Sequence, residues 1–202
     1  MRFASSANGG NGDGEGWRIE RHRLVGARQR PSPHFDERPE ATGAIELLVI
    51  HAISLPPEQF GGPWIDALFA GTLDAAAHPY FETIQGLRVS AHCCIFRDGS
   101  ITQYVDFDRR AWHAGASEWR GRTRANDFSI GIELEGSDTQ AFEPAQYETL
   151  AGVSAALLAA YPTLSPEAIT GHSDIAPGRK TDPGPHFEWA HYRARLAALL
   201  AS

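Results

Sequence analysis

The sequence predicts a single α/β domain in which a mixed central β-sheet is packed by helices. Two observations predict this class. Short apolar runs typical of buried strands are interspersed with longer Ala/Leu-rich segments of helical spacing, and an Asp-Gly turn signal joins two strand segments as an antiparallel pair. With 202 residues, and roughly 150 residues per domain, a single domain with an extension is expected, because two full domains would be cramped. We expect residues 1–16, rich in Gly, Ser, Asn and Asp, to be a flexible tail, and residues 17–202 to be the domain.

The strands are expected in three places. Residues 45–50 are an apolar run that stops at His51, which is typical of a strand buried on both faces and ending at that histidine. Residues 89–105 surround Asp98-Gly99, a strong hairpin signal, and are expected to form two antiparallel strands. Residues 129–136 alternate strictly, so one face is apolar and Glu133 leaves the sheet from the other face.

Three helices are expected to pack on this sheet. Residues 144–160 are rich in Ala and Leu, begin at a proline and are closed by Pro162. A shorter helix begins after Pro63 and covers residues 64–69. A third helix, residues 187–200, is expected to bury a stripe formed by Tyr192, Leu196, Leu199 and Leu200.

Composition and charge exclude several classes of function. Eighteen Lys and Arg against twenty-five Asp and Glu give a net charge of −7, which repels phosphate backbones, so no nucleic-acid partner is expected. The two cysteines, Cys93 and Cys94, are adjacent, a spacing that suits neither an ordinary disulfide nor a CxxC motif. No signal peptide or membrane-spanning stretch is visible. We therefore expect a soluble, cytoplasmic protein without a membrane partner, and nothing in the sequence requires more than a monomer.

Two segments carry candidate metal ligands. His51 ends the first core strand, and strand ends are where open α/β sheets commonly build sites. Residues 170–185 form a Gly- and Pro-rich loop that holds His172, one Arg, one Lys and two Asp. Two histidines and one carboxylate are the ligand set of a catalytic zinc that keeps one position for water. The spacing matches no standard zinc pattern, so from the residues alone the metal site remains a suggestion.

A thiol-based site is an alternative. His92 is adjacent to Cys93 and Cys94, so a Cys/His nucleophilic pair is conceivable. Adjacent strand residues point to opposite faces, and a free cysteine usually fills a core, so we do not favour this interpretation.

Several motifs follow one another along the chain, at residues 51–57, 60–65, 88–92, 112–115, 126–136, 171–177 and 180–185. Together they resemble one family, the AmpD-type N-acetylmuramoyl-L-alanine amidases. The resemblance covers about residues 16–200, and the chain resembles the cytoplasmic 1,6-anhydro form used in cell-wall recycling.

The resemblance implies a set of functional residues. The family's zinc ligands match His51, His172 and Asp182, which implies one Zn²⁺ per chain. Its catalytic pair matches Glu133 and Lys180. Bound zinc lowers the pKa of water to about 7 and polarises a carbonyl. Glu133 would move a proton from the water to the departing amine, which is typically worth about 10²–10⁴-fold. Lys180 would stabilise the developing oxyanion.

Substrate contacts are expected from other residues within the family-like segments. Arg88, Arg124 and Arg179 could bind carboxylates or the sugar side, with Arg179 preferred. Trp112 is either a cleft wall or a core residue, and Ala176 completes the expected set. His113 is expected in the core or behind the ligands rather than as a fourth ligand.

One position departs from the family pattern. Ala52 stands where close relatives have Asn, so any hydrogen bond from that amide to substrate is absent. The expected zinc ligands are unaffected by this change.

The resemblance implies zinc-dependent hydrolysis of the amide bond between N-acetylmuramic acid, in its 1,6-anhydro form, and the L-alanine of muropeptides in peptidoglycan recycling. The alternative is a non-catalytic muropeptide-binding or sensing protein on the same fold. A metal-independent Ser or Cys hydrolase is remote, because no Gly-x-Ser-x-Gly motif is present.

Overall fold

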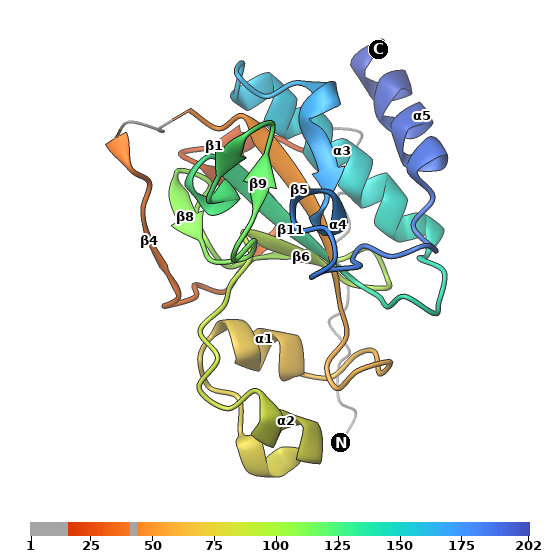
Figure 1. Cartoon of the computed structure of the whole chain (residues 1–202). Coiled ribbons are helices and arrows are strands. Elements are labelled where there is room, and N and C mark those ends of the chain that lie inside the picture. Colours follow the sequence, from red (N-terminus) through yellow and green to blue (C-terminus); the bar gives the residue numbers. More distant parts are fainter. Residues whose placement is uncertain (1–15, 41–43) are drawn as a thin grey trace, which may run out of the picture.

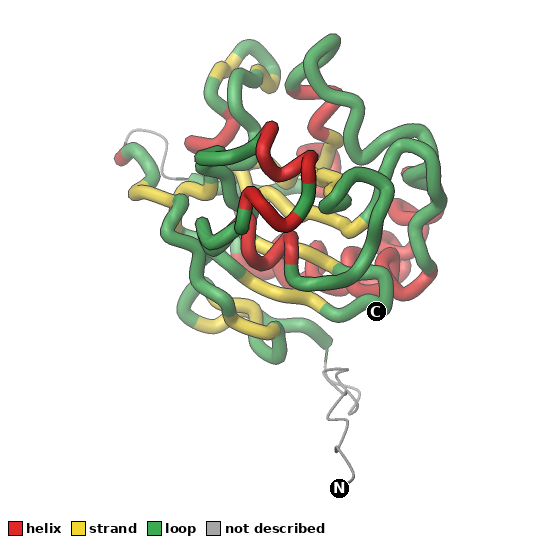
Figure 2. The backbone as a smooth tube through the Cα atoms, turned by 90° about the horizontal axis from the view of Figure 1, so that it is seen from below, coloured by secondary structure: helices red, strands yellow, loops and turns green. Residues whose placement is uncertain are grey.

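The computed structural model describes residues 16–40 and 44–202. A six-stranded mixed sheet in the order β12-β5-β11-β6-β7-β3 forms its centre (Figure 1). Figure 2 shows that much of the chain around these strands is loop. The expected α/β class with a mixed sheet is confirmed. The sheet strands are β3 (Arg28–Gln29), β5 (Leu47–Ile53), β6 (Cys93–Ile95), β7 (Ile101–Gln103), β11 (Ser129–Glu135) and β12 (Ile169–Gly171).

The sheet combines parallel and antiparallel pairs. Strands β12, β5, β11 and β6 run parallel, so their carboxyl ends meet at one edge. Strands β6 and β7 form the antiparallel hairpin expected around Asp98-Gly99, where Gly99 adopts a φ of +81°.

The pairing of β5 with β11 corrects one expectation. His51 does not end its strand, because β5 continues to Ile53 and pairs there with Glu135. In the same register, Glu133 lies beside His51. Strand β12 ends beside Ile50, so His172 directly follows the neighbouring strand.

Helices α3 (Pro144–Ala160) and α5 (Trp189–Leu200) pack together on one side of the sheet (Figure 1). Helix α3 has the predicted bounds. Gln146 joins it to the sheet by donating hydrogen bonds to the main-chain oxygens of Ile95 and Glu135. The apolar face of β11 is part of the core formed there, which also includes Leu150, Val153, Leu157, Tyr192 and Leu196.

The stripe predicted for α5 is only half correct. Tyr192 and Leu196 are buried, whereas Leu199 and Leu200 are 37% and 48% exposed. Both leucines lie in the last turn of α5, where Leu200 lines a surface cavity with Pro166 and Ile169 instead of joining the core.

The short helices α1 (Trp64–Phe69), η2 (Ala75–Ala77) and α2 (Pro79–Thr83) form a separate lobe, which lies below the sheet in Figure 1. A second core cluster lies here and includes Ile65, Phe69 and Phe81. Its buried carboxylate, Asp66, accepts hydrogen bonds from Tyr104 Oη (2.6 Å) and Arg28 Nη2 (2.5 Å).

The remaining elements are short. The amino-terminal segment lies across the domain, with Leu24 buried and its N–H bonded to Gln103 Oε1 at 2.8 Å.

Within the described residues, no helix is long and apolar enough to cross a bilayer. The expected tail lies outside the described residues except for Gly16. The short elements are β1 (Ile19–Glu20), β2 (Arg23–Leu24), β4 (Phe35–Glu37), β8 (Arg109–Ala111), β9 (Glu118–Trp119), β10 (Arg122–Thr123), η3 (Ala125–Asp127), η4 (Pro166–Ala168) and α4 (His172–Ile175).

Candidate metal centre and active site

Three side chains converge at the carboxyl edge of the parallel strands. His51 Nδ1, His172 Nδ1 and Asp182 Oδ2 lie 3.0 Å from one another in every pairing. His51 comes from β5, His172 begins α4 directly after β12, and Asp182 comes from the loop that follows α4. The structure therefore brings together the three residues that the sequence analysis expected as metal ligands.

Local sequence explains how the Asp182 loop approaches α4. A Cβ atom on Gly171 would lie 2.8 Å from Pro183 Cδ, so only glycine leaves room for this loop. The N–H of Ser173 donates to the main-chain oxygen of Asp182 at 2.9 Å, which fixes the loop against the first turn of α4. The N–H of Gly171 donates to Asp174 Oδ2 at 2.9 Å and stabilises that turn.

The protonation of the cluster suits a cation. Burial lowers the pKa of His51 to about 4, so its imidazole is neutral at pH 7 and has a free lone pair. Burial alone would raise the pKa of Asp182, but hydrogen bonds with His172 and His51 hold it below its ordinary value. A neutral imidazole and an ionised carboxylate are among the ligands that zinc prefers.

The geometry also fits a metal ion. Around a tetrahedral zinc with ligand distances of about 2.0–2.1 Å, neighbouring ligand atoms are about 3.3 Å apart. The observed separations of 3.0 Å therefore need to widen by only about 0.3 Å. Three electron-pair donors this close repel one another unless a proton or a cation lies between them.

Glu133 lies beside this cluster. It is adjacent to His51 in the β5–β11 register, and its Oε2 is buried without a hydrogen-bond partner among the described residues. Burial raises the pKa of Glu133 well above its ordinary value, the charge of Asp182 raises it further, and the charge of Lys180 lowers it. A buried carboxylate without a hydrogen bond at one oxygen is a candidate proton acceptor.

Lys180 is exposed and lies two residues before Asp182. Its positive charge acts on both Glu133 and His51, lowering the pKa of each. The expected catalytic lysine is therefore within electrostatic reach of the cluster.

The cysteines do not form a nucleophilic site. Cys93 and Cys94 are fully buried, and burial raises the pKa of both thiols, so neither is a thiolate at pH 7. The structure supports the interpretation that both are core residues.

His113 lies behind a proposed ligand, as expected, whereas the contacts of Asn126 and Ser129 with it were not predicted from the sequence. His113 Nδ1 lies 2.9 Å from His51 Nε2, and its Nε2 lies 3.2 Å from Ser129 Oγ. Asn126 Oδ1 accepts hydrogen bonds from the N–H groups of His113 and Ala114. Both Asn126 and Ser129 lie in a motif that the sequence analysis singled out, but no periodicity indicates these contacts.

Comparisons with known proteins agree with the site. A family model for N-acetylmuramoyl-L-alanine amidases matches residues 41–185. The chain belongs to this amidase family. The expected family and the expected enzyme class are confirmed.

The relatives of this amidase extend over almost the whole chain. The 1,6-anhydro-N-acetylmuramyl-L-alanine amidase AmpD of Escherichia coli K12 is 62% identical over 179 residues, which cover 89% of this chain and 97% of that protein. A crystal structure of a selenomethionine derivative of AmpD matches with a TM-score of 0.85 and 60% identity, covering 88% of this chain and 98% of that chain. The E. coli amidase AmiD, solved with anhydro-N-acetylmuramic acid-L-Ala-D-gamma-Glu-L-Lys as substrate, matches at 32% identity with a TM-score of 0.56, covering 89% of this chain and 65% of that chain.

The expected substrate contacts of the amidase fall into separate places. Ala176 and Arg179 line a cavity of about 780 Å³ together with Trp119 and Arg120. Arg88 lines a different, smaller cavity of about 270 Å³.

The remaining expected contacts are held by hydrogen bonds or ion pairs. Trp112 is half-buried, and its Nε1 donates to Asp36 Oδ1 at 3.1 Å. Arg124 is exposed and pairs with Asp127 at 3.1 Å. Arg179 donates through Nε and Nη2 to main-chain oxygens of Ala114 and Ala116, which leaves Nη1 as its remaining donor group for a ligand.

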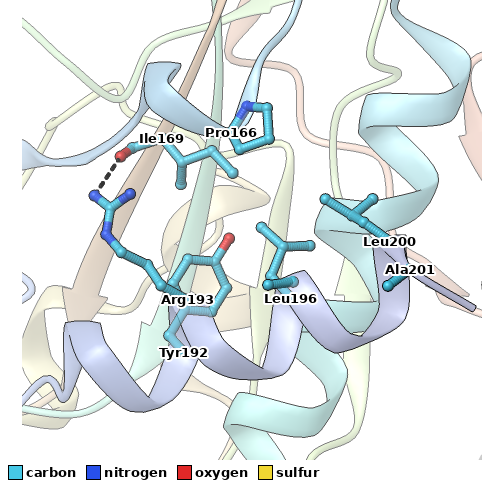
Figure 3. Close-up of a pocket in the computed structure, with 8 residues that line it drawn as sticks. Pro166, Ile169, Tyr192, Arg193, Leu196, Leu200 and Ala201 are labelled. Atoms are coloured by element: carbon cyan, nitrogen blue, oxygen red, sulfur yellow. Dashed lines mark hydrogen bonds between the residues drawn. The ribbon is translucent and has the colours of Figure 1, made fainter.

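The amidase also has an apolar cavity of about 370 Å³ between α5 and the edge strand β12 (Figure 3). Its one charged side chain, Arg193, donates to the main-chain oxygen of Ile169 at 3.3 Å. Among the described residues that line it, none is a carboxylate, histidine or cysteine, so this cavity has no group suited to amide hydrolysis.

Proposed function

We propose that this amidase is a zinc enzyme that cleaves the amide bond between N-acetylmuramic acid, in its 1,6-anhydro form, and the L-alanine of muropeptides. The proposal is carried by the convergence of His51, His172 and Asp182 next to Glu133, whose Oε2 atom has no hydrogen-bond partner in the part of the chain that the structure describes. The printed names of AmpD and of the substrate bound to AmiD support the choice of substrate.

His51, His172 and Asp182 are the proposed ligands of one zinc ion per chain. When bound, the ion lowers the pKa of water and polarises a carbonyl group. Neutral imidazoles and an ionised carboxylate are the protonation states that bind it, and the lowered pKa values of His51 and Asp182 are consistent with both.

Glu133 is the proposed general base and acid. Its carboxylate accepts a proton from the attacking water and passes it to the nitrogen of the departing L-alanine, because an amine leaves an amide readily only when protonated. The Oε2 atom that lacks a protein partner is available for this proton.

Lys180 is the proposed stabiliser of the oxyanion. An ammonium group placed near the carbonyl interacts more strongly with the charge of the tetrahedral transition state than with the neutral amide, so it raises turnover more than affinity.

The substrate's carboxylates and sugar are proposed to lie against Ala176 and Arg179 in the cavity next to α4. Arg88, Trp112 and Arg124 remain proposed contacts at other parts of the surface. We further propose that the enzyme acts as a cytoplasmic monomer in peptidoglycan recycling.

The test is release of the L-alanine-led peptide from purified 1,6-anhydromuropeptide, followed by liquid chromatography. The protein is assayed as isolated, after chelation, and after zinc is restored. A muropeptide with hydrated muramic acid and the same peptide serves as the matched substrate.

Cleavage that disappears on chelation and returns with zinc is the expected result, with the anhydro substrate cleaved faster. Binding without cleavage by a zinc-loaded protein would contradict the proposal and favour a muropeptide-binding or sensing protein. Equal rates on both substrates would contradict only the anhydro preference.

A further inference from the structure

Each proposed histidine ligand has a second ring nitrogen that needs a partner. The Nδ1 atoms of His51 and His172 face Asp182, so a neutral imidazole that binds metal there carries its proton on Nε2. An Nε2–H group in a buried site requires a hydrogen-bond acceptor, which also fixes the orientation of the ring.

Two consecutive residues supply both acceptors. His51 Nε2 lies 2.9 Å from His113 Nδ1, and His172 Nε2 lies 3.1 Å from the main-chain oxygen of Ala114. His113 can accept because its own Nε2 lies 3.2 Å from Ser129 Oγ, an acceptor for the Nε2 proton. The segment His113-Ala114 therefore contacts both histidines from the side opposite the metal position.

This segment is held from two directions. Asn126 Oδ1 accepts from the N–H groups of His113 at 3.1 Å and of Ala114 at 2.8 Å. On the other side, Arg179 Nη2 donates to the oxygen of Ala114 at 2.6 Å. One amide oxygen thus sets the position of two neighbouring residues, each of which contacts a different ligand.

The sheet is shaped to receive the His113 ring. A Cβ atom on Gly131 would lie 2.4 Å from His113 Cγ and 2.5 Å from Nδ1. No real Cβ tolerates such distances, so glycine at this position of β11 is what allows the ring to reach His51.

Resting on the zinc site proposed above, we propose that His113 and Asn126 are positioning residues: Asn126 holds the His113-Ala114 segment so that it accepts the Nε2–H groups of both histidine ligands. The segment fixes the tautomer and ring orientation in which both Nδ1 atoms face the metal. Loss of such outer partners typically lowers metal affinity by about 10–100-fold.

The test measures the zinc dissociation constant by competition with a chromophoric chelator, starting from metal-free protein.

His113→Phe removes the acceptor but keeps a ring, whereas His113→Asn keeps an oxygen close to the position of Nδ1. Asn126→Leu removes the shared acceptor, and Asn126→Asp retains it. His191→Phe changes a histidine that packs on Tyr147, and serves as the matched control. Circular dichroism establishes that each variant is folded.

We expect His113→Phe and Asn126→Leu to weaken zinc binding by about 10–100-fold. His113→Asn, Asn126→Asp and His191→Phe should bind zinc nearly as tightly as the unchanged protein. Folded His113→Phe with unchanged zinc affinity overturns the inference. If Asn126→Leu does not fold, the inference is tested by comparing the zinc affinities of His113→Phe and His113→Asn. Equal affinities for these two variants would also overturn the inference.

The same titration separates this inference from the proposed function. Asp182→Ala removes a proposed ligand and should abolish tight zinc binding. Tight binding by Asp182→Ala, or none by the unchanged protein, would contradict the zinc site itself and this inference with it. Loss of binding in Asp182→Ala without an effect of His113→Phe would contradict this inference only.

Discussion

The side chains on one face of β11 are packed in the core, whereas a side chain on the other face lacks a hydrogen-bond partner at one atom. On one face, Ile130, Ile132 and Leu134 are fully buried in the core that includes residues of α3 and α5. On the other face, Glu133 is half-buried, and its buried Oε2 atom has no hydrogen-bond partner among the described residues. A strand that serves stability with one face thus keeps a carboxyl oxygen without a hydrogen bond on the other, which is the distribution expected where function competes with stability.

The other acidic residue on the same face sharpens this contrast. Glu135 accepts hydrogen bonds from the N–H groups of Gly61 at 2.5 Å and Arg97 at 3.2 Å, so its carboxylate anchors two loops. Within residues 16–40 and 44–202, Oε2 of Glu133, two residues earlier, accepts no such hydrogen bond. Both Glu133 and Glu135 are acidic residues on this face of β11, so an acidic side chain alone does not identify the proposed catalytic group. The two residues differ in that Glu133 Oε2 accepts no hydrogen bond among the described residues.

The largest effect is expected from Glu133→Gln. The amide keeps the shape of the side chain but does not take a proton from water, so turnover of anhydromuropeptide should fall by about 10²–10⁴-fold. Zinc content, measured by atomic absorption, should stay at one ion per chain. An unchanged rate would remove Glu133 from the mechanism.

Substitutions on the apolar face of β11 should change the stability of the protein but not its turnover. Ile132→Ala should lower the free energy of unfolding by about 2–5 kcal/mol, and Ile132→Val by about 0.5–1.5 kcal/mol, measured by urea denaturation. The rate per folded, zinc-loaded molecule should remain close to that of the unchanged protein. A large loss of rate in folded Ile132→Val would show that the two faces are not independent.

Glu133→Gln should also stabilise the protein in the presence of chelator. Because burial raises the folded-state pKa of Glu133 above 4.5, the folded state binds its proton more tightly than the unfolded chain does. The stability contributed by this proton is present below pH 4.5 and is lost as the pH rises towards the folded-state pKa. At pH 7 the variant should be more stable by about 1–3 kcal/mol, and at pH 4 the difference should disappear. Equal melting temperatures at pH 7 would contradict the cost assigned to the buried carboxylate.

The smallest effects are expected at the cysteines, which lie on different sides of β6. Cys93 is in the core cluster with Ile132, and Cys94 is in the second cluster. Cys93→Ala and Cys94→Ala should each cost about 1 kcal/mol of unfolding free energy without changing turnover. Loss of turnover in a folded, zinc-loaded variant would revive a role for the thiols.

Local patterns predicted the regular elements well. Pro144 and Pro162 delimit α3, alternation defines the faces of β11, and Asp98-Gly99 locates the hairpin. These signals are local because backbone conformation and burial periodicity depend on neighbouring residues.

The errors arose where partners far apart in sequence decide the structure. Strand β5 extends past His51 because it pairs with β11, about eighty residues later. The contact between His113 and His51 depends on a glycine in yet another segment. The ligand roles came from the family resemblance, since the spacing of His51, His172 and Asp182 matched no known zinc pattern.

The close approach of His113 to Gly131 has a consequence for how this sequence can change. Any side chain at position 131 requires the ring at position 113 to move or shrink, because the Cβ atom would lie 2.4 Å from it. A smaller residue at 113 would in turn remove the reason for glycine at 131. Among homologous chains, these two positions are therefore expected to covary, with substitution at 113 preceding or accompanying substitution at 131.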